Sequence, residues 1–432
     1  MTEDERARLR AAVPGDVREV CRVLTAAGFQ AVTVGGAVRD ALCGRDPGDW
    51  DVATSAHPDE VIARFRRVIP TGLAHGTVTV MVGQGESRQG VEVTTFRGEG
   101  AYSDARRPDS VEFGVPLERD LARRDFIVNA IAYDPIGETI HDPFGGRADL
   151  AAKRLRAVGV PLERFTEDGL RVMRAVRFAA TLELSIDPET EAAIPGALGA
   201  LARVSQERVH DELRKLLAAP QPSRGLVVAE RTGVLRTIAP ELGERAAARF
   251  AVIDRVDGGD KVDRALRRVA ALWTAVGAPD AMTGDDEARA AQGDGVAAKA
   301  IDAAMRRLKF ASDERDRIVR AARVAHAGAR SWSDAGVRRI LAGVGRGRAP
   351  DAIAVWRGQG DAALAERAEV ILARGDALAT GELAVTGAAL MTALGLPPGR
   401  RVGELLAILL ERVLDEPASN TAEALIAIAR AA

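Results

Sequence analysis

The sequence predicts a protein of the α+β class, in which an N-terminal region with a mixed β-sheet and helices is followed by an all-helical remainder. Up to about residue 150, short β-branched runs alternate with glycines and helix-compatible stretches. After residue 151 the chain becomes rich in Ala, Leu, Arg and Glu at helical spacing. Because 432 residues exceed the usual size of one hydrophobic core, we expect two to four domains.

The first elements follow from the apolar runs of the N-terminal region. Residues 31–34, Ala-Val-Thr-Val, are short and β-branched, as in a buried strand. Gly35 and Gly36 then form a tight turn, and residues 37–42 are compatible with a helix. Further runs predict strands at residues 50–53, 77–82 and 91–96.

Two alternate carboxylates, Asp49 and Asp51, stand at the start of the second predicted strand. The pleat of a strand would place both side chains on one face. Such a pair can hold Mg²⁺, which prefers oxygen ligands and keeps positions open for substrate phosphates, in two-metal phosphoryl transfer. Backbone N–H groups at a helix start can cradle phosphate. Either feature alone is commonly structural, but the ordered pairing of the glycine turn with the aspartates indicates a nucleotidyltransferase site.

Composition narrows the remaining classes of function. The net charge is −2, from 60 basic and 62 acidic residues, so any nucleic-acid contact must come from a local basic surface. The N-terminus is charged and no run of 18 apolar residues exists, so we expect a cytoplasmic protein without membrane association. Gly-x-Gly-x-x-Gly is absent at the first turn, which argues against a dinucleotide-binding oxidoreductase.

The first motif of the chain is Gly35-Gly36-Ala37-Val38-Arg39-Asp40 with Asp49 and Asp51, and four further motifs follow it in order. They are Arg123-Arg124-Asp125-Phe126-Ile127-Val128-Asn129-Ala130, Asp142-Pro143-Phe144-Gly145-Gly146, Glu167-Asp168-Gly169-Leu170-Arg171 with Arg174 and Arg177, and Glu207-Arg208-Val209-His210-Asp211-Glu212-Leu213. In this order the motifs resemble those of class II tRNA nucleotidyltransferases, the family of CCA-adding enzymes and bacterial poly(A) polymerases. The chain departs from the family pattern at Gly169, where Pro is common, and at Cys43 and Ile127.

The second and fourth motifs have a physical interpretation of their own. On a helix, Asp125 and Asn129 would share a face within reach of a ribose hydroxyl, and the Arg124 guanidinium suits phosphate. Asp168 and Arg171, three apart on a helix, would present an acceptor beside a donor fork. This pair of side chains would match the hydrogen-bonding edge of cytosine and adenine, which offer an exocyclic amine beside a ring-nitrogen acceptor. Arg174 and Arg177 follow Arg171 at three-residue spacing and would face the triphosphate and base. The alternative is that these charged residues form an ordinary solvent-exposed helix face.

The resemblance implies both a division of the chain and a set of site residues. It implies a nucleotidyltransferase head at 1–150, a helical neck that recognises the base at 151–220, a helical body at 221–330 and a helical tRNA-binding tail at 331–432. It also implies catalytic Asp49 and Asp51, with Glu92 as a third ligand for Mg²⁺. The expected nucleotide-binding residues are Gly35, Gly36, Arg39, Arg124, Asp125, Asn129, Asp168, Arg171, Arg174 and Arg177.

The leading hypothesis is CCA addition to the 3′ end of tRNA from CTP and ATP. A poly(A) polymerase, a CC- or A-only enzyme and a noncatalytic RNA-binding protein are the alternatives. The resemblance places a loop that helps A addition at residues 98–108, which favours full CCA synthesis. The helical half is expected to grip the tRNA elbow and acceptor stem through phosphates. Candidate contacts, which could equally be solvated faces, are Arg264-Arg267-Arg268, Arg306-Arg307-Lys309 and Arg315-Arg317-Arg320-Arg323.

Overall fold

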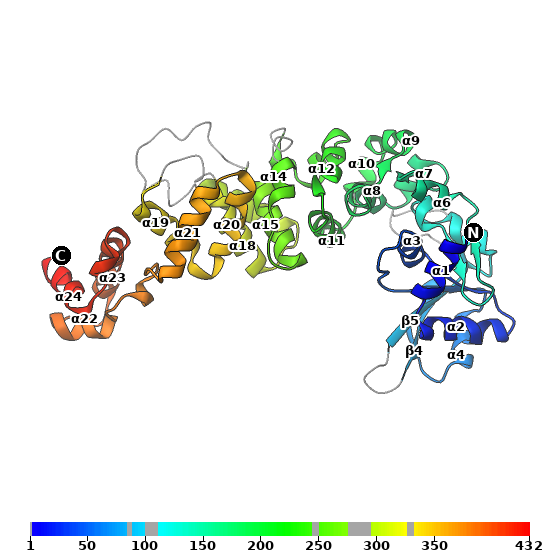
Figure 1. The fold of residues 1–432 in the computed structure, drawn as a ribbon, viewed down its shortest axis with the longest axis horizontal. Helices are drawn as coiled ribbons and strands as arrows, with labels where there is room; N and C mark the ends of the chain where they lie inside the picture. Colours follow the sequence, from blue (N-terminus) through cyan, green and yellow to red (C-terminus); the bar gives the residue numbers. More distant parts are fainter. Residues whose placement is uncertain (1, 84–88, 100–110, 244–249, 275–294, 326–331) are drawn as a thin grey trace. The chain divides into compact units, whose positions relative to one another are not determined.

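The computed structural model describes residues 2–83, 89–99, 111–243, 250–274, 295–325 and 332–432 (Figure 1). The chain divides into two compact units. Unit 1 comprises Met1–Ser205 and Arg231–Thr237, and unit 2 comprises Gln206–Glu230 and Ile238–Ala432. The predicted loop at 98–108 lies mostly outside the described residues.

A seven-stranded mixed sheet forms the centre of unit 1. Its order is β3 (Val68–Gly72), β4 (Thr77–Val82), β5 (Gln89–Thr95), β2 (Asp51–Thr54), β1 (Ala31–Val34), β8 (Ala132–Asp134) and β9 (Thr139–His141). Its neighbouring strands are antiparallel except β2 and β5, which are parallel. A separate ladder joins β6 (Arg97–Glu99) to β7 (Val111–Phe113). The strands predicted from β-branched runs are therefore confirmed, with boundary shifts of one or two residues.

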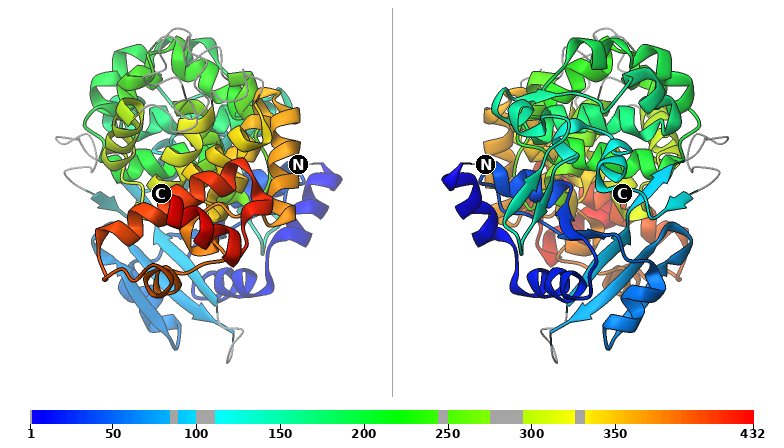
Figure 2. Two further views of the ribbon diagram at one scale, coloured as in Figure 1. Left: turned by 90° about the vertical axis from the view of Figure 1, so that its left-hand side faces the viewer. Right: turned by 90° about the vertical axis from the view of Figure 1, so that its right-hand side faces the viewer.

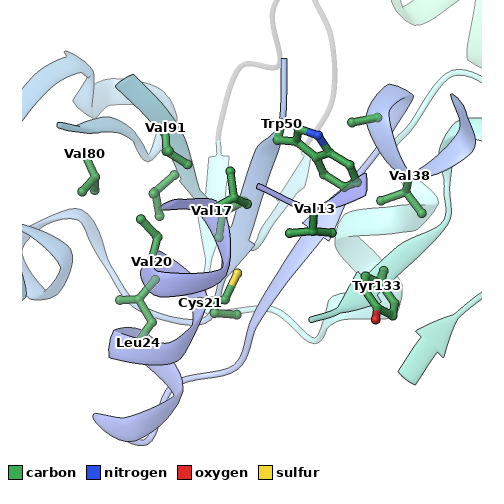
Figure 3. Packing of buried hydrophobic residues seen from close by; sticks show 14 of the residues in the cluster. Val13, Val17, Val20, Cys21, Leu24, Val38, Trp50, Val80, Val91 and Tyr133 are labelled. Atoms are coloured by element: carbon green, nitrogen blue, oxygen red, sulfur yellow. The ribbon is translucent and has the colours of Figure 1, made fainter. Parts of the chain in front are cut away.

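Helices cover both faces of this sheet because alternate strand residues are apolar on each side. On one face, α2 (Gly15–Ala26) packs Val17, Val20, Cys21 and Leu24 against the valines of β4 and β5 (Figure 3). On the other, Val32 and Val34 of β1 lie in a second cluster with residues of α5 (Leu117–Ala122). The remaining helices of the sheet region are α1 (Glu3–Ala12), α3 (Gly36–Leu42), α4 (Pro58–Arg64) and α6 (Gly146–Ala151).

After residue 151 the chain is helical with one exception. Two-residue strands β10 (Arg154–Leu155) and β11 (Ser185–Ile186) pair in parallel, so this part is not entirely helical as predicted. The helices of the unit 1 part are α7 (Pro161–Glu167), α8 (Leu170–Thr181), α9 (Pro188–Ala192), α10 (Leu198–Leu201) and α13 (Val234–Ile238).

Unit 2 is built from helices in its described residues, as Figure 2 also shows from two sides. They are α11 (Gln206–Leu217), α12 (Pro222–Arg231), α14 (Phe250–Arg255), α15 (Lys261–Trp273), α17 (Gly295–Arg307), α18 (Ser312–Val324), α19 (Asp334–Val344), α20 (Ala349–Gln359), α21 (Ala362–Arg374), α22 (Gly387–Leu394), α23 (Arg400–Asp415) and α24 (Ala422–Ala431). The α+β class is thus confirmed. None of the helices in the described ranges has the length and apolar character needed to cross a membrane.

Candidate active site

The glycine turn between β1 and α3 is shaped around an arginine. Gly35 has φ +81° and its N–H donates to the Ile131 carbonyl at 3.3 Å. A Cβ atom at Gly35 would lie 2.8 Å from Nη1 of Arg124, so only glycine leaves room for this guanidinium. Gly36 begins α3, as the sequence predicts. The structure thus brings Arg124, which follows Gly35 by 89 positions in the sequence, against the turn.

Two of the predicted carboxylates, Asp49 and Glu92, lie within electrostatic reach of the third, Asp51, which begins β2, while Glu92 is in the middle of β5. Val52 pairs with Val93 in the parallel ladder, which sets Asp51 beside Glu92 on the adjacent strand. Burial raises the pKa of Asp51, the negative charges of Glu92 and Asp49 raise it further, and Arg124 opposes them. Asp49 itself precedes β2, and Asp49, Asp51 and Glu92 are all exposed by solvent accessibility, so the desolvation of Asp51 is partial.

The carboxylates of Asp49, Asp51 and Glu92 suit a hard cation, provided that the substrate supplies further ligands. In the described residues no group of three or more His, Cys, Asp or Glu side chains is gathered as a ready-made metal cluster. Mg²⁺ is commonly bound through one or two carboxylates together with substrate phosphates, so it does not need such a cage. A cation would also relieve the like charges that surround Asp51.

Asp125 and Asn129 are neighbours, but the α-helix predicted for them is wrong. α5 ends at Ala122, and only a 3₁₀ turn at Ile127–Asn129 follows. The chain bends between them because Phe126 is fully buried and bridges to Ala157. Even so, Nδ2 of Asn129 donates to Oδ1 of Asp125 at 2.9 Å.

A buried polar network extends from this pair in both directions. Nε of Arg174 donates to Oδ2 of Asp125 at 2.5 Å, and Nη1 of Arg39 donates to Oδ1 of Asn129 at 2.5 Å. Arg39 also forms a fork with Asp40 at 2.9 and 2.8 Å. Burial pushes the pKa of Asp125 up, but Arg174 and Asn129 outweigh it and lower the pKa to about 2. Asp125 is therefore held ionised.

Three arginines surround the Phe178 ring on α8. The guanidinium carbons of Arg39, Arg174 and Arg177 lie 5.3, 5.2 and 4.1 Å from the ring centre. The ring packs edge-on against Phe126, 5.7 Å away. Cation–π contacts of this kind help to hold cations at fixed positions, so α8 presents its arginine row on a rigid support.

Asp168 and Arg171 do not share a helix, which corrects the second helical prediction. α7 ends at Glu167 and α8 begins at Leu170, and Asp168 is extended between them with its Oδ1 accepting the Leu170 N–H at 3.0 Å. Arg171, 9% exposed, donates to Glu167 at 2.6 Å and to the Arg123 carbonyl at 3.3 Å. The two side chains still flank the same helix start.

The basic clusters predicted as an RNA-binding surface are largely engaged within unit 2. Arg267 and Arg317 both bind Asp351, which is 5% exposed. Arg268 is buried and donates to the carbonyls of Leu217, Ala219 and Val256. Six other members also pair with acids, namely Arg264 with Asp257, Arg306 and Arg315 with Asp302, Arg307 with Glu241, Lys309 with Glu207 and Arg320 with Asp316.

Two acidic residues that hold site arginines were given no role from the sequence. Asp40 holds Arg39, and Asp120, 1% exposed, lies 3.6 Å from Nη2 of Arg124. The available signal was weak: Asp120 stands four residues before Arg124, a spacing typical of a helical ion pair.

The mixed sheet, the glycine turn beside strand carboxylates and the arginine-bearing helix together define a nucleotidyltransferase-type head followed by helices. Residues 31–156 match the family model for the poly A polymerase head domain. Residues 183–245 match the model for an RNA and SrmB binding site of polymerase A, and residues 295–429 match tRNA nucleotidyltransferase domain 2.

Comparison with individual proteins narrows this class to a family. The solved Bacillus stearothermophilus CCA-adding enzyme in complex with CTP is 32% identical, with 96% of each chain covered and a TM-score of 0.74. The CCA-adding enzymes of Levilactobacillus brevis and Geobacillus stearothermophilus are 46% identical over 217 residues and 47% over 228 residues. The chain belongs to the family of tRNA nucleotidyltransferases and bacterial poly(A) polymerases.

The extent of these matches differs. The two curated relatives match 50% and 53% of this chain, and the chain spans about half their length, 53% and 55%. The Thermotoga maritima CCA-adding enzyme complexed with tRNA has a TM-score of 0.67 at 18% identity, a similarity of fold alone.

Proposed function

We propose that the protein adds CCA to the 3′ end of tRNA from CTP and ATP, with release of pyrophosphate. The observation that carries this proposal is the convergence of the Gly35 turn, the Arg124 guanidinium and the Asp51–Glu92 pair in one place. Similarity over 96% of the chain to a CCA-adding enzyme solved with CTP supports the substrate class. The division into head, neck, body and tail and a cytoplasmic location belong to the same proposal.

The site residues then have distinct roles. Backbone N–H groups at Gly35 and Gly36, with Arg124, would hold the triphosphate. Asp49 and Asp51, with Glu92, would hold Mg²⁺, which activates an attacking hydroxyl and neutralises phosphate charge. The tRNA terminal hydroxyl attacks the α-phosphate and pyrophosphate leaves.

Ribose and base would be held by the neck side of unit 1. Asp125 is kept ionised by Arg174, and a carboxylate has about four lone-pair sites, which leaves room for a ribose hydroxyl. Asp168 and Arg171 would read the amine and ring nitrogen of cytosine or adenine. Arg39, whose donors are bound to Asp40 and Asn129, would contribute by fixing Asn129 as well as by any contact of its own with nucleotide.

Poly(A) synthesis is the second candidate, because residues 31–156 match a head domain named for poly A polymerase. The two activities share the transfer step and differ in the product, so product length distinguishes them.

Substitution of the carboxylates tests the transfer step. Asp49→Asn and Asp51→Asn should each lower the rate of CTP incorporation into tRNA that lacks its CCA end by on the order of a hundredfold or more, because the cation loses a charged ligand. Asp46→Asn, at an exposed aspartate in the same segment, should keep the wild-type rate. Chelation with EDTA should stop the reaction and Mg²⁺ should restore it. Full activity of both variants would refute the assigned roles.

A further inference from the structure

A buried aspartate outside the assigned site residues lies behind Arg124. Asp120 is on α5 and is 1% exposed. Its Oδ1 accepts the Arg97 N–H at 3.2 Å and Nε of Arg123 at 2.9 Å. Its Oδ2 is buried and has no hydrogen-bond partner among the described residues, and Nη2 of Arg124 lies 3.6 Å away. One oxygen of this carboxylate is therefore anchored, while the other faces Arg124 without a full hydrogen bond.

Arg124 is placed between this carboxylate and the glycine turn. Its Nη1 lies against Gly35, where a Cβ atom would be only 2.8 Å away. Its Nε is buried and makes no hydrogen bond within the part of the chain that the structure describes. Its side chain is only 20% exposed. A guanidinium with so little solvent and so few hydrogen bonds needs a compensating charge.

Asp120 supplies that charge without occupying the donors of Arg124. At 3.6 Å between Nη2 of Arg124 and Oδ2 of Asp120, the two groups form an ion pair without a hydrogen bond. By contrast, Arg39 is bound by Asp40 through two hydrogen bonds of 2.9 and 2.8 Å. Arg124 therefore has N–H donors available for an incoming anion at the turn, whereas the N–H donors of Arg39 are hydrogen-bonded to Asp40 and Asn129.

We propose that Asp120 is a positioning residue for the triphosphate of CTP and ATP. Its buried carboxylate keeps Arg124 charged and seated beside Gly35 with N–H donors available to phosphate. This inference rests on the proposed function, because it takes Arg124 as the phosphate contact.

A charge-removing variant tests the proposal. Asp120→Asn keeps the size of the side chain and an oxygen for the Arg97 N–H, but turns an amide or a neutral oxygen towards Arg124. We expect KM for CTP and for ATP to rise about tenfold, the loss expected for one charged phosphate contact, with kcat changed much less. The dissociation constant of CTP, measured by calorimetry on the full chain without tRNA, should rise by the same factor.

A matched control separates positioning from general destabilisation. Asp149 is another fully buried aspartate of unit 1, paired with Arg154 and Arg156. Asp149→Asn should lower the melting temperature but leave KM and CTP affinity at wild-type values. If Asp120→Asn raises KM no more than Asp149→Asn does, the proposal is overturned.

A double variant covers the case in which Asp120→Asn alone does not fold. Asp120→Asn with Arg124→Gln removes both buried charges, and its CTP dissociation constant should equal that of Arg124→Gln alone within about twofold, because the effect of Asp120 on the triphosphate passes through Arg124. A dissociation constant several-fold above that of Arg124→Gln, or wild-type affinity in Arg124→Gln, would overturn the proposal. Wild-type protein that binds CTP but transfers no nucleotide would overturn the proposed function and leave this binding comparison decisive.

Discussion

At the scale of the residue, the candidate site depends on charges that are buried with specific partners. Asp125 is 8% exposed and ionised because Arg174 and Asn129 donate to it. The sequence predicted that Asp125 and Asn129 would be close, and they are. It could not predict Arg174 as the partner of Asp125, because the two are 49 positions apart and no local pattern connects them.

Asp125 should make folding stability depend on pH. Its folded pKa of about 2 lies below the value of 3.8 for a free aspartate, so its ionised form stabilises the fold above about pH 4. That contribution is lost as the pH falls from about 4 towards 2. Asp125→Asn should therefore lower the free energy of unfolding by about 2 kcal/mol at pH 7, and by progressively less in acid.

Urea unfolding of both proteins at pH 7 and pH 3 measures this difference. An exposed substitution, Asp46→Asn, should give the same small change at both values. A deficit for Asp125→Asn that is equally large at pH 3 would show that its charge is not what stabilises the fold.

At the scale of the element, strands were predicted better than helix ends. The β-branched runs of β1, β4 and β5 carry their own signal. The break between α7 and α8 has no such local sequence signal, because it depends on a contact with residues distant in the sequence. A Cβ atom at Gly169 would lie 2.4 Å from the carbonyl of Ala200, a contact that the local sequence cannot reveal. Asp168 was consequently placed on a helix it only precedes.

The close approach at Gly169 predicts a sharp difference between two glycines. Gly169→Ala forces a methyl group into the backbone of α10 and should destabilise unit 1 by about 1–3 kcal/mol. Gly199→Ala, on α10 where nothing lies within 4 Å of the new Cβ atom, should be neutral or stabilising by up to about 1 kcal/mol. Thermal unfolding compares the two, and equal effects would contradict the packing described for α8 and α10.

At the scale of the whole molecule, composition along the chain predicted a mixed α/β region followed by helices. The function of the arginine clusters in unit 2 was not predictable in the same way. Arg267 lies 84 positions from its partner Asp351 in the sequence. Arg268 binds carbonyls that are between 12 and 51 positions away. Arginine spacing on a helix looks the same whether the side chains bind RNA or hold other helices, so remote partners had to come from the structure.

The sequence of the reaction product tests CCA addition most directly. Full-length protein is incubated with tRNA that lacks its 3′ CCA, CTP, ATP and Mg²⁺, and the RNA 3′ ends are sequenced, with an Asp49→Ala, Asp51→Ala double variant as control. We expect addition of C, C and A followed by arrest, and no addition by the control. Long A tails, or no addition by the wild type, would contradict this expectation.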